Sequence, residues 1–173
     1  MIFVTVGTDH HRFDRLMDWI EEWAAGPGAG VPCVVQHGSS RAPRGVEAHA
    51  FLPHERVQEL FRRSAAVVSQ GGPGSIIESR TAGRKPIVVP RLPELDEVVD
   101  DHQVRFSRHL ARLGDIGLAE NRLALFAHLR QALKNPGWYT ASHDAAAAHE
   151  AVSRFGELVA ELVSPSRSAR ARS

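Results

Sequence analysis

Residues 65–79 read AAVVSQGGPGSIIES, an apolar run followed by a glycine-rich turn and a second, partly apolar segment. The β-branched run is typical of a strand that is buried on both faces of a sheet. The turn at residues 70–75 predicts the start of a helix that continues to about Gly83. A strand, a glycine loop and a helix in direct succession make up the basic unit of a parallel α/β sheet.

The same alternation continues on both sides of this unit. Residues 2–6, IFVTV, read as another buried strand, and apolar residues at three- and four-residue spacing between Phe13 and Trp23 predict the helix after it. Further strands are expected at residues 31–36, 46–52, 85–90 and 115–119, and further helices around residues 57–61, at residues 102–113 and twice near the C-terminus. This order predicts an α/β fold with a doubly wound parallel sheet of Rossmann-like type. Because ligands bind beyond the carboxyl ends of such strands, the loops after the first, fourth and fifth strands are expected to meet at one crevice.

Length and composition indicate one domain with a core of its own. With 173 residues, 43% of them hydrophobic, the chain is expected to form one domain over residues 1–163. Residues 164–173 make a polar, basic tail that we expect to be disordered. Cys33 is the only cysteine, which excludes an internal disulfide and favours a buried structural thiol.

Charge and hydropathy argue against binding to nucleic acid and against insertion into a membrane. Three arginines of the tail account for more than the formal net charge of +1, so the body has no basic footprint for nucleic acid. No apolar run reaches the roughly 18 residues of a membrane span, and the N-terminus lacks the pattern of a signal peptide. We therefore expect a cytoplasmic protein.

The glycine loop is a candidate phosphate site. Gly71, Gly72 and Gly74 lie between a strand and a helix, where backbone N–H groups and the positive helix end hold phosphate well. The spacing fits neither GxxxxGK[ST] nor GxGxxG, which argues against a P-loop enzyme and a nicotinamide dehydrogenase. A purely structural turn is the alternative. Ser75 is expected to cap the helix, to bind a phosphate oxygen, or to do both.

Glu78 lies about one turn further along the predicted helix. If phosphates sit at the helix end, its carboxylate would reach two adjacent ribose hydroxyls. The alternative is a first-turn acid that stabilises the helix dipole.

Residues 100–103, DDHQ, begin the helix after the fifth strand. Asp101, His102 and Gln103 are groups that read sugar hydroxyls through directional hydrogen bonds. Capping of the helix by aspartate is the alternative for this segment.

A polar segment, VGTDHH, follows the first strand at residues 6–11. Thr8, Asp9, His10 and His11 are placed to reach donor phosphates or a reacting hydroxyl. Adjacent histidines point in different directions on most backbones, and no third ligand occurs at helical spacing, so we predict no metal site.

Five motifs occur in an order that resembles the glycosyltransferase family 28 C-terminal domain. They are MIFVTVGT, RFDRL, VVSQGGPGSIIES, GRKPIVVPR and EVVDDHQ, spread over roughly residues 1–118. The chain is most similar to the small soluble subunits of bacterial exopolysaccharide glycosyltransferases. Those subunits are related to the eukaryotic catalytic subunit that adds the second GlcNAc to dolichol-linked sugar.

The resemblance implies one half of a two-Rossmann-domain, GT-B glycosyltransferase, with a membrane-associated partner supplying the acceptor half. The family's donor contacts fall on Leu52, through its backbone to uracil, and on Gly72, Gly74, Ser75, Glu78 and Gln103. Gly7, Thr8, Gly71, Asp101 and His102 complete our predicted donor site. Asp9 and Val98 depart from the family pattern, since similar subunits often have histidine there.

The predicted activity is transfer of a hexose from a UDP-sugar to a lipid-linked saccharide, inverting, independent of metal and without a cofactor. His10 and His11 are the only candidates within the chain for the general base, and the alternative is that the partner supplies it. The alternative is a non-catalytic nucleotide-sugar-binding or scaffold subunit of a polysaccharide biosynthesis complex. Apolar residues at helical spacing form a stripe between Val152 and Val163. The stripe either docks the partner, which would recruit the chain to the inner face of the membrane, or packs on the chain's own sheet. A homodimer could use the same surface.

Overall fold

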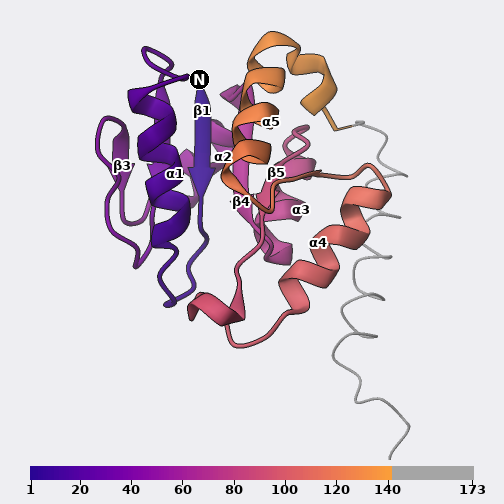
Figure 1. The fold of residues 1–173 in the computed structure, drawn as a ribbon. Helices are drawn as coiled ribbons and strands as arrows, with labels where there is room; N and C mark the ends of the chain where they lie inside the picture. The colour runs from indigo at the N-terminus through magenta and orange to yellow at the C-terminus, as the bar shows by residue number, and fades with distance from the viewer. Residues whose placement is uncertain (142–173) are drawn as a thin grey trace, which may run out of the picture. The chain divides into compact units, whose positions relative to one another are not determined.

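The computed structural model describes residues 1–141, which form a six-stranded parallel sheet with helices on both faces (Figure 1). The strands follow the spatial order β3-β2-β1-β4-β5-β6. The order reverses between β1 and β4, which makes this the topological switch point of a doubly wound sheet. The predicted fold class is therefore confirmed. The expected tail at residues 164–173 and the apolar stripe near the C-terminus lie outside the described residues.

The strands are short and mostly buried. Their bounds are Ile2–Thr5 (β1), Cys33–Gln36 (β2), Glu47–His49 (β3), Ala66–Gln70 (β4), Ile87–Val89 (β5) and Gly117–Leu118 (β6). Strand β3 covers only part of the expected segment 46–52 because it is the edge strand and pairs with β2 alone. Phe51 and Leu52 beyond it are therefore free of the sheet.

Side chains of the central strands alternate between two apolar layers. Ile2 and Val4 of β1 face one layer and Phe3 faces the other, as expected when both faces of a parallel sheet are covered. Cys33 lies in the first layer and is 7% exposed, which confirms the prediction of a buried thiol. Burial raises the pKa of this thiol to about 12.

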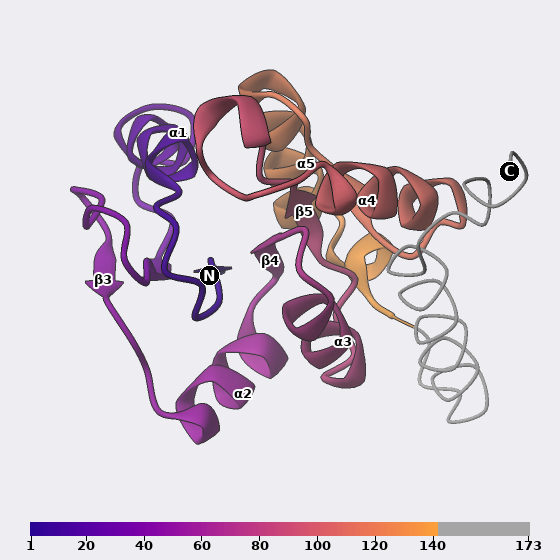
Figure 2. The same cartoon turned by 90° about the horizontal axis from the view of Figure 1, so that it is seen from below.

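Five α-helices connect or follow the strands in the described part of the chain: Asp14–Ala25 (α1), His54–Arg63 (α2), Pro73–Thr81 (α3), His102–Arg112 (α4) and Arg122–Lys134 (α5). Helices α1 and α5 cover one face, where Trp23 packs edge-on against Phe126 at 5.2 Å between ring centroids. Helices α2 and α3 lie on the opposite face (Figure 2). Helix α4 packs beside β6. None of the described helices has the length and apolar content needed to cross a bilayer.

Candidate functional site

A cavity of about 440 Å³ opens at the carboxyl ends of β1 and β4, the position expected for a ligand in this fold. Its walls come from the loops after β1 and β4, the start of α3 and the segment between β3 and α2. Among the residues predicted for donor binding, those that line it are Gly7, Thr8, Leu52, Gly72, Gly74, Ser75 and Glu78. The loop after β5 does not line the cavity, so the expected three-loop crevice is formed by the first two loops together with the β3–α2 segment.

Helix α3 points its N-terminus at this cavity. Gly72 is the N-cap and Pro73 the first helical residue, so Ser75 lies inside the first turn and makes no capping hydrogen bond. The prediction of a Ser75 cap is therefore wrong, because proline is preorganised for the first helical position and starts the helix two residues earlier. The N–H groups of Gly74 and Ser75 have no acceptor within the helix. A side chain on Gly74 would meet nothing within 4 Å, so the backbone here is accessible to a ligand.

The carboxylate of Glu78 lines the same cavity. The first turn of α3 contains no acidic residue, so Glu78 is not the first-turn acid that we weighed as an alternative. Within residues 1–141 this carboxylate has no hydrogen-bond or ion-pair partner, although Glu78 is half-buried. A partly desolvated carboxylate without a partner has its acceptor capacity free for a ligand.

Gly7 and Gln70 meet in the lining of the cavity. Gly7 has a positive φ of 71°, and a Cβ built on it would lie 2.5 Å from Gln70 Nε2. Only glycine tolerates both the left-handed backbone and this close approach. The amide of Gln70 therefore lies beside the loop after β1, in the lining of the cavity.

Arg91 fixes the orientation of that amide. Its Nε donates to Gln70 Oε1 at 2.6 Å, so the opposite atom of the amide, Nε2, is the one near Gly7 and Gly72. A nitrogen at that position is a hydrogen-bond donor directed toward the cavity. Within residues 1–141, the side chain of Gln70 makes one hydrogen bond, the one that its Oε1 accepts from Arg91, so Nε2 has no acceptor there.

The guanidinium of Arg91 is fully buried and ties three loops together. Besides Gln70, it donates to the carbonyl oxygens of Val6 at 3.4 Å, His11 at 2.9 Å and Glu97 at 3.1 Å. Burial lowers the pKa of Arg91, while the carboxylates of Asp9 and Glu97 counteract this effect. This arginine connects the loop after β5 to the cavity that the loop itself does not line.

A second buried contact supports Arg91. Arg15 of α1 binds both carboxylate oxygens of Glu97, at 2.9 and 2.7 Å. Paired, parallel hydrogen bonds of this kind give strong geometric definition. Gln70, Arg91 and Glu97 were not predicted from the sequence. The available signal was that Gln70 and Arg91 are polar residues at the ends of buried apolar strands.

Leu52 and Phe51, from the segment between β3 and α2, also line the cavity. The N–H of Leu52 donates to Gln36 Oε1 at 3.0 Å, and Gln36 Nε2 donates to Thr5 Oγ1 at 3.3 Å. These two bonds hold the Leu52 backbone in place against the sheet. Phe51 is 58% exposed and offers an aromatic ring at the rim.

The remaining predicted donor contacts do not line the cavity. Gly71 packs against α4, where an added Cβ would lie 3.0 Å from the Cβ of Gln103. Gln103 Oε1 accepts a long 3.4 Å hydrogen bond from the backbone N–H of Arg91. His102 Nδ1 lies 2.8 Å from Asp100 Oδ2, and Asp101 is exposed. Donor contact by Gly71, Asp101, His102 and Gln103 therefore stays a prediction.

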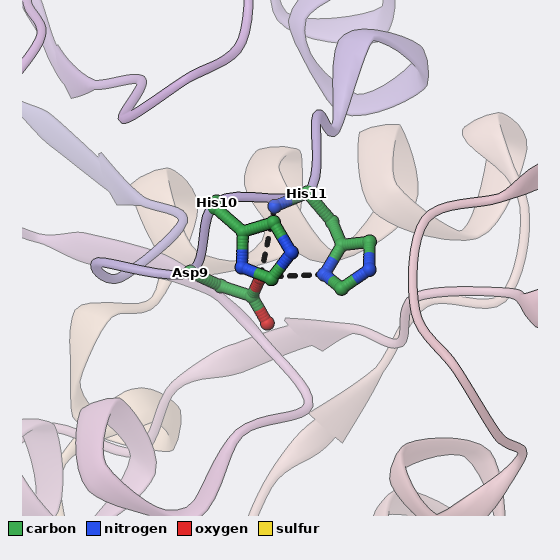
Figure 3. A group of neighbouring side chains, drawn as sticks. All are labelled: Asp9, His10 and His11. Atoms are coloured by element: carbon green, nitrogen blue, oxygen red, sulfur yellow. Dashed lines mark hydrogen bonds and ion pairs between the residues drawn. The ribbon is translucent and has the colours of Figure 1, made fainter.

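The loop after β1 brings Asp9, His10 and His11 together beside the cavity (Figure 3). Asp9 Oδ1 lies 2.7 Å from His11 Nδ1 and accepts the backbone N–H of His11 at 2.9 Å. Burial would raise the pKa of Asp9, but the hydrogen bonds from His11 and the charge of Arg91 outweigh it, so the pKa is lowered. The premise that the adjacent histidine rings point apart is wrong, because their centroids lie 4.1 Å apart.

Comparison with known proteins identifies the family. The model of the glycosyltransferase family 28 C-terminal domain matches residues 1–157. The protein belongs to this family. Comparison with proteins of curated function gives no match.

Solved structures with the same fold are longer than this family 28 domain. The glycotransferase of kitacinnamycin is 20% identical, with a TM-score of 0.56 over 92% of this chain and 39% of that one. CalG4, the calicheamicin glycosyltransferase, is 18% identical, with a TM-score of 0.54 over 97% of this chain and 41% of that one. The chain thus spans about two fifths of each relative, and the likeness shows a shared GT-B-type Rossmann fold. As a family 28 C-terminal domain, it is a donor-binding domain of a glycosyltransferase.

Proposed function

We propose that this family 28 domain transfers a hexose from a UDP-sugar to a lipid-linked saccharide, together with a membrane-associated partner that binds the acceptor. The observation that carries the proposal is the cavity that joins the N-terminus of α3, the unpartnered carboxylate of Glu78 and the backbone at Leu52. These three groups suit the diphosphate, the ribose and the base of one nucleotide.

Different groups in the cavity suit different parts of the UDP-sugar. The diphosphate is attracted by the N–H groups of Gly74 and Ser75 and by the helix dipole. The amide of Gln70, which also lines the cavity, adds a further N–H for it. Glu78 accepts hydrogen bonds from two ribose hydroxyls. Because the N–H of Leu52 is taken by Gln36, the carbonyl oxygen of Leu52 is the group left for an N–H of uracil.

The proposed reaction is a direct displacement at the sugar, which this placement would support. The acceptor hydroxyl attacks the anomeric carbon of the sugar as the bond to the UDP oxygen breaks, which inverts the configuration. Negative charge then develops on the departing diphosphate, where the end of α3 stabilises it without a metal ion. His11, oriented by its hydrogen bond to Asp9, and His10 are the candidates within the chain for the base that takes the hydroxyl proton.

The partner belongs to the proposal and rests on the resemblance to split bacterial glycosyltransferases. The chain spans about two fifths of its structural relatives, and a second domain would enclose the acceptor. A membrane-associated subunit would supply that domain and would recruit the chain to the inner face of the membrane. Pairing of two copies of this chain is the other arrangement to be tested.

The deciding experiment measures binding and transfer separately. UDP is titrated calorimetrically into the purified chain, and transfer from radiolabelled UDP-sugars is then assayed in membranes with and without the co-expressed partner. We expect UDP to bind the chain alone and transfer to require the partner. Binding without transfer under any condition would favour the alternative of a non-catalytic subunit, and absence of UDP binding would refute the proposed donor class.

A further inference from the structure

Three potential metal ligands converge in the loop after β1 (Figure 3). His11 Nδ1 and His10 Nδ1 lie 2.7 and 3.6 Å from the same oxygen, Asp9 Oδ1. All three ligand atoms lie within 4.8 Å of one another. The tertiary structure therefore supplies the third ligand that helical spacing in the sequence does not.

The two separations that involve Asp9 are close to those of a metal site. Zinc bonds of about 2.0–2.2 Å place two ligand atoms of a tetrahedral site about 3.3–3.5 Å apart. The pair Asp9–His11 would have to open by roughly 0.6 Å and the pair Asp9–His10 to close by roughly 0.2 Å. His10 has room for this movement because its side chain is 87% exposed.

Hydrogen bonds from a buried side chain fix the backbone that carries the ligands. The buried Arg91 donates to the carbonyl oxygens of His11 at 2.9 Å and Arg12 at 3.2 Å. Such outer contacts orient ligands before a metal arrives and reduce the entropy lost on binding. The positive charge of Arg91 opposes a cation, but the buried carboxylate of Glu97 and the Asp9 ligand itself offset it.

We propose that Asp9, His10 and His11 bind one divalent transition-metal ion, with zinc as the reference ion. Two imidazole nitrogens and one carboxylate favour Zn²⁺, Cu²⁺ and Ni²⁺ over Mg²⁺ and Ca²⁺, which prefer oxygen ligands. Three protein ligands leave a coordination position open to water or to an incoming group. None of the three residues lines the cavity at the end of α3, so the proposed metal site does not use the groups that we propose for the diphosphate.

Occupation of this site would have a consequence that rests on the proposed function. A bound ion takes the lone pairs of both imidazoles, and neither can then accept a proton from the acceptor. Zinc should therefore lower transfer in the reconstituted complex while leaving UDP binding to the chain unchanged.

The test is direct titration of the full chain with zinc chloride, followed calorimetrically in the absence of nucleotide. His10→Ala and Asp9→Asn are compared with His49→Ala, which serves as a matched control because His49 also pairs with a carboxylate two residues away, Glu47, at 2.9 Å. Thermal melting of each variant confirms that it folds. Cobalt absorption of the same proteins reports on the ligand set independently of affinity.

We expect one equivalent of zinc to bind the wild type, at least tenfold weaker binding in His10→Ala and Asp9→Asn, and no change in His49→Ala. Magnesium at the same concentration should not bind. The proposal is overturned if the wild type binds no zinc, or if His10→Ala binds it within twofold of the wild type. Because no nucleotide is present, either result is independent of whether the chain binds UDP.

Discussion

Gln70 and Arg91 are joined by a buried hydrogen bond in which Arg91 Nε donates to Gln70 Oε1 at 2.6 Å. The bond fixes the Gln70 amide so that its nitrogen is directed toward Gly7 and the cavity. One end of this amide therefore joins a structural network, and the other end is free for a ligand.

Replacing Gln70 with glutamate separates these two roles. The carboxylate still accepts from Arg91, but it has no N–H to donate and repels a diphosphate. We expect the fold to be retained and the affinity for UDP to fall by about 1.5–3 kcal/mol, or at least tenfold. Uridine, which has no phosphate, should bind as it does to the wild type.

Calorimetric titration with UDP and uridine, with melting curves as a control for folding, measures both effects. Equal losses for the two ligands would place Gln70 away from the phosphates. An unchanged UDP affinity in the folded variant would remove it from the site altogether.

Glu78→Ala should weaken UDP binding by about 1.5–3 kcal/mol, because a hydrogen bond between a charged group and the ribose is lost. Deoxy-UDP, which lacks one ribose hydroxyl, should bind the wild type more weakly than UDP does. In Glu78→Ala the difference between the two ligands should shrink, since the partner of that hydroxyl is gone. Glu94→Ala is a suitable control, because Glu94 is exposed and does not line the cavity. A variant that discriminates the two ligands as well as the wild type does would contradict the ribose assignment.

Transfer in the reconstituted complex should tolerate a chelator. The N-terminus of α3 offers backbone N–H groups where a metal-dependent enzyme would hold a cation. We expect EDTA to leave the rate unchanged and added manganese to give no increase, as measured by product formation from labelled donor. Loss of activity in EDTA that manganese restores would show that the diphosphate is bound through a metal.

Cys33 should resist alkylation in the native protein. Its pKa is raised to about 12 by burial, so the thiolate, which is the reactive form, is scarce at pH 8. Iodoacetamide should modify the urea-unfolded chain at least 100-fold faster than the folded one, a ratio of the order expected from a shift of two or more pKa units. Mass spectrometry of timed samples measures both rates. Comparable rates would mean that β2 opens readily to solvent.

The sequence by itself determined the elements of the fold and the part of the candidate site that lies in the loop after β4 and in α3. Parallel strands covered on both faces appear as continuous apolar runs, so β1, β2, β4 and β5 were predictable from residue type alone. Gly72, Gly74, Ser75 and Glu78 lie within one loop and one helix, and local spacing therefore predicted that they would share a ligand.

The tertiary structure decided the contacts between segments that are distant along the chain. Arg91 is 21 residues from Gln70 and 80 residues from His11, so no local spacing could predict that one buried guanidinium binds both. The convergence of His10 and His11 on Asp9 depends on the path of a short loop whose backbone Arg91 holds. Local periodicity indicates which face of a helix or strand is buried. The partners of a buried polar group depend instead on how the helices and strands pack, because every hydrogen-bond donor and acceptor removed from water must be satisfied.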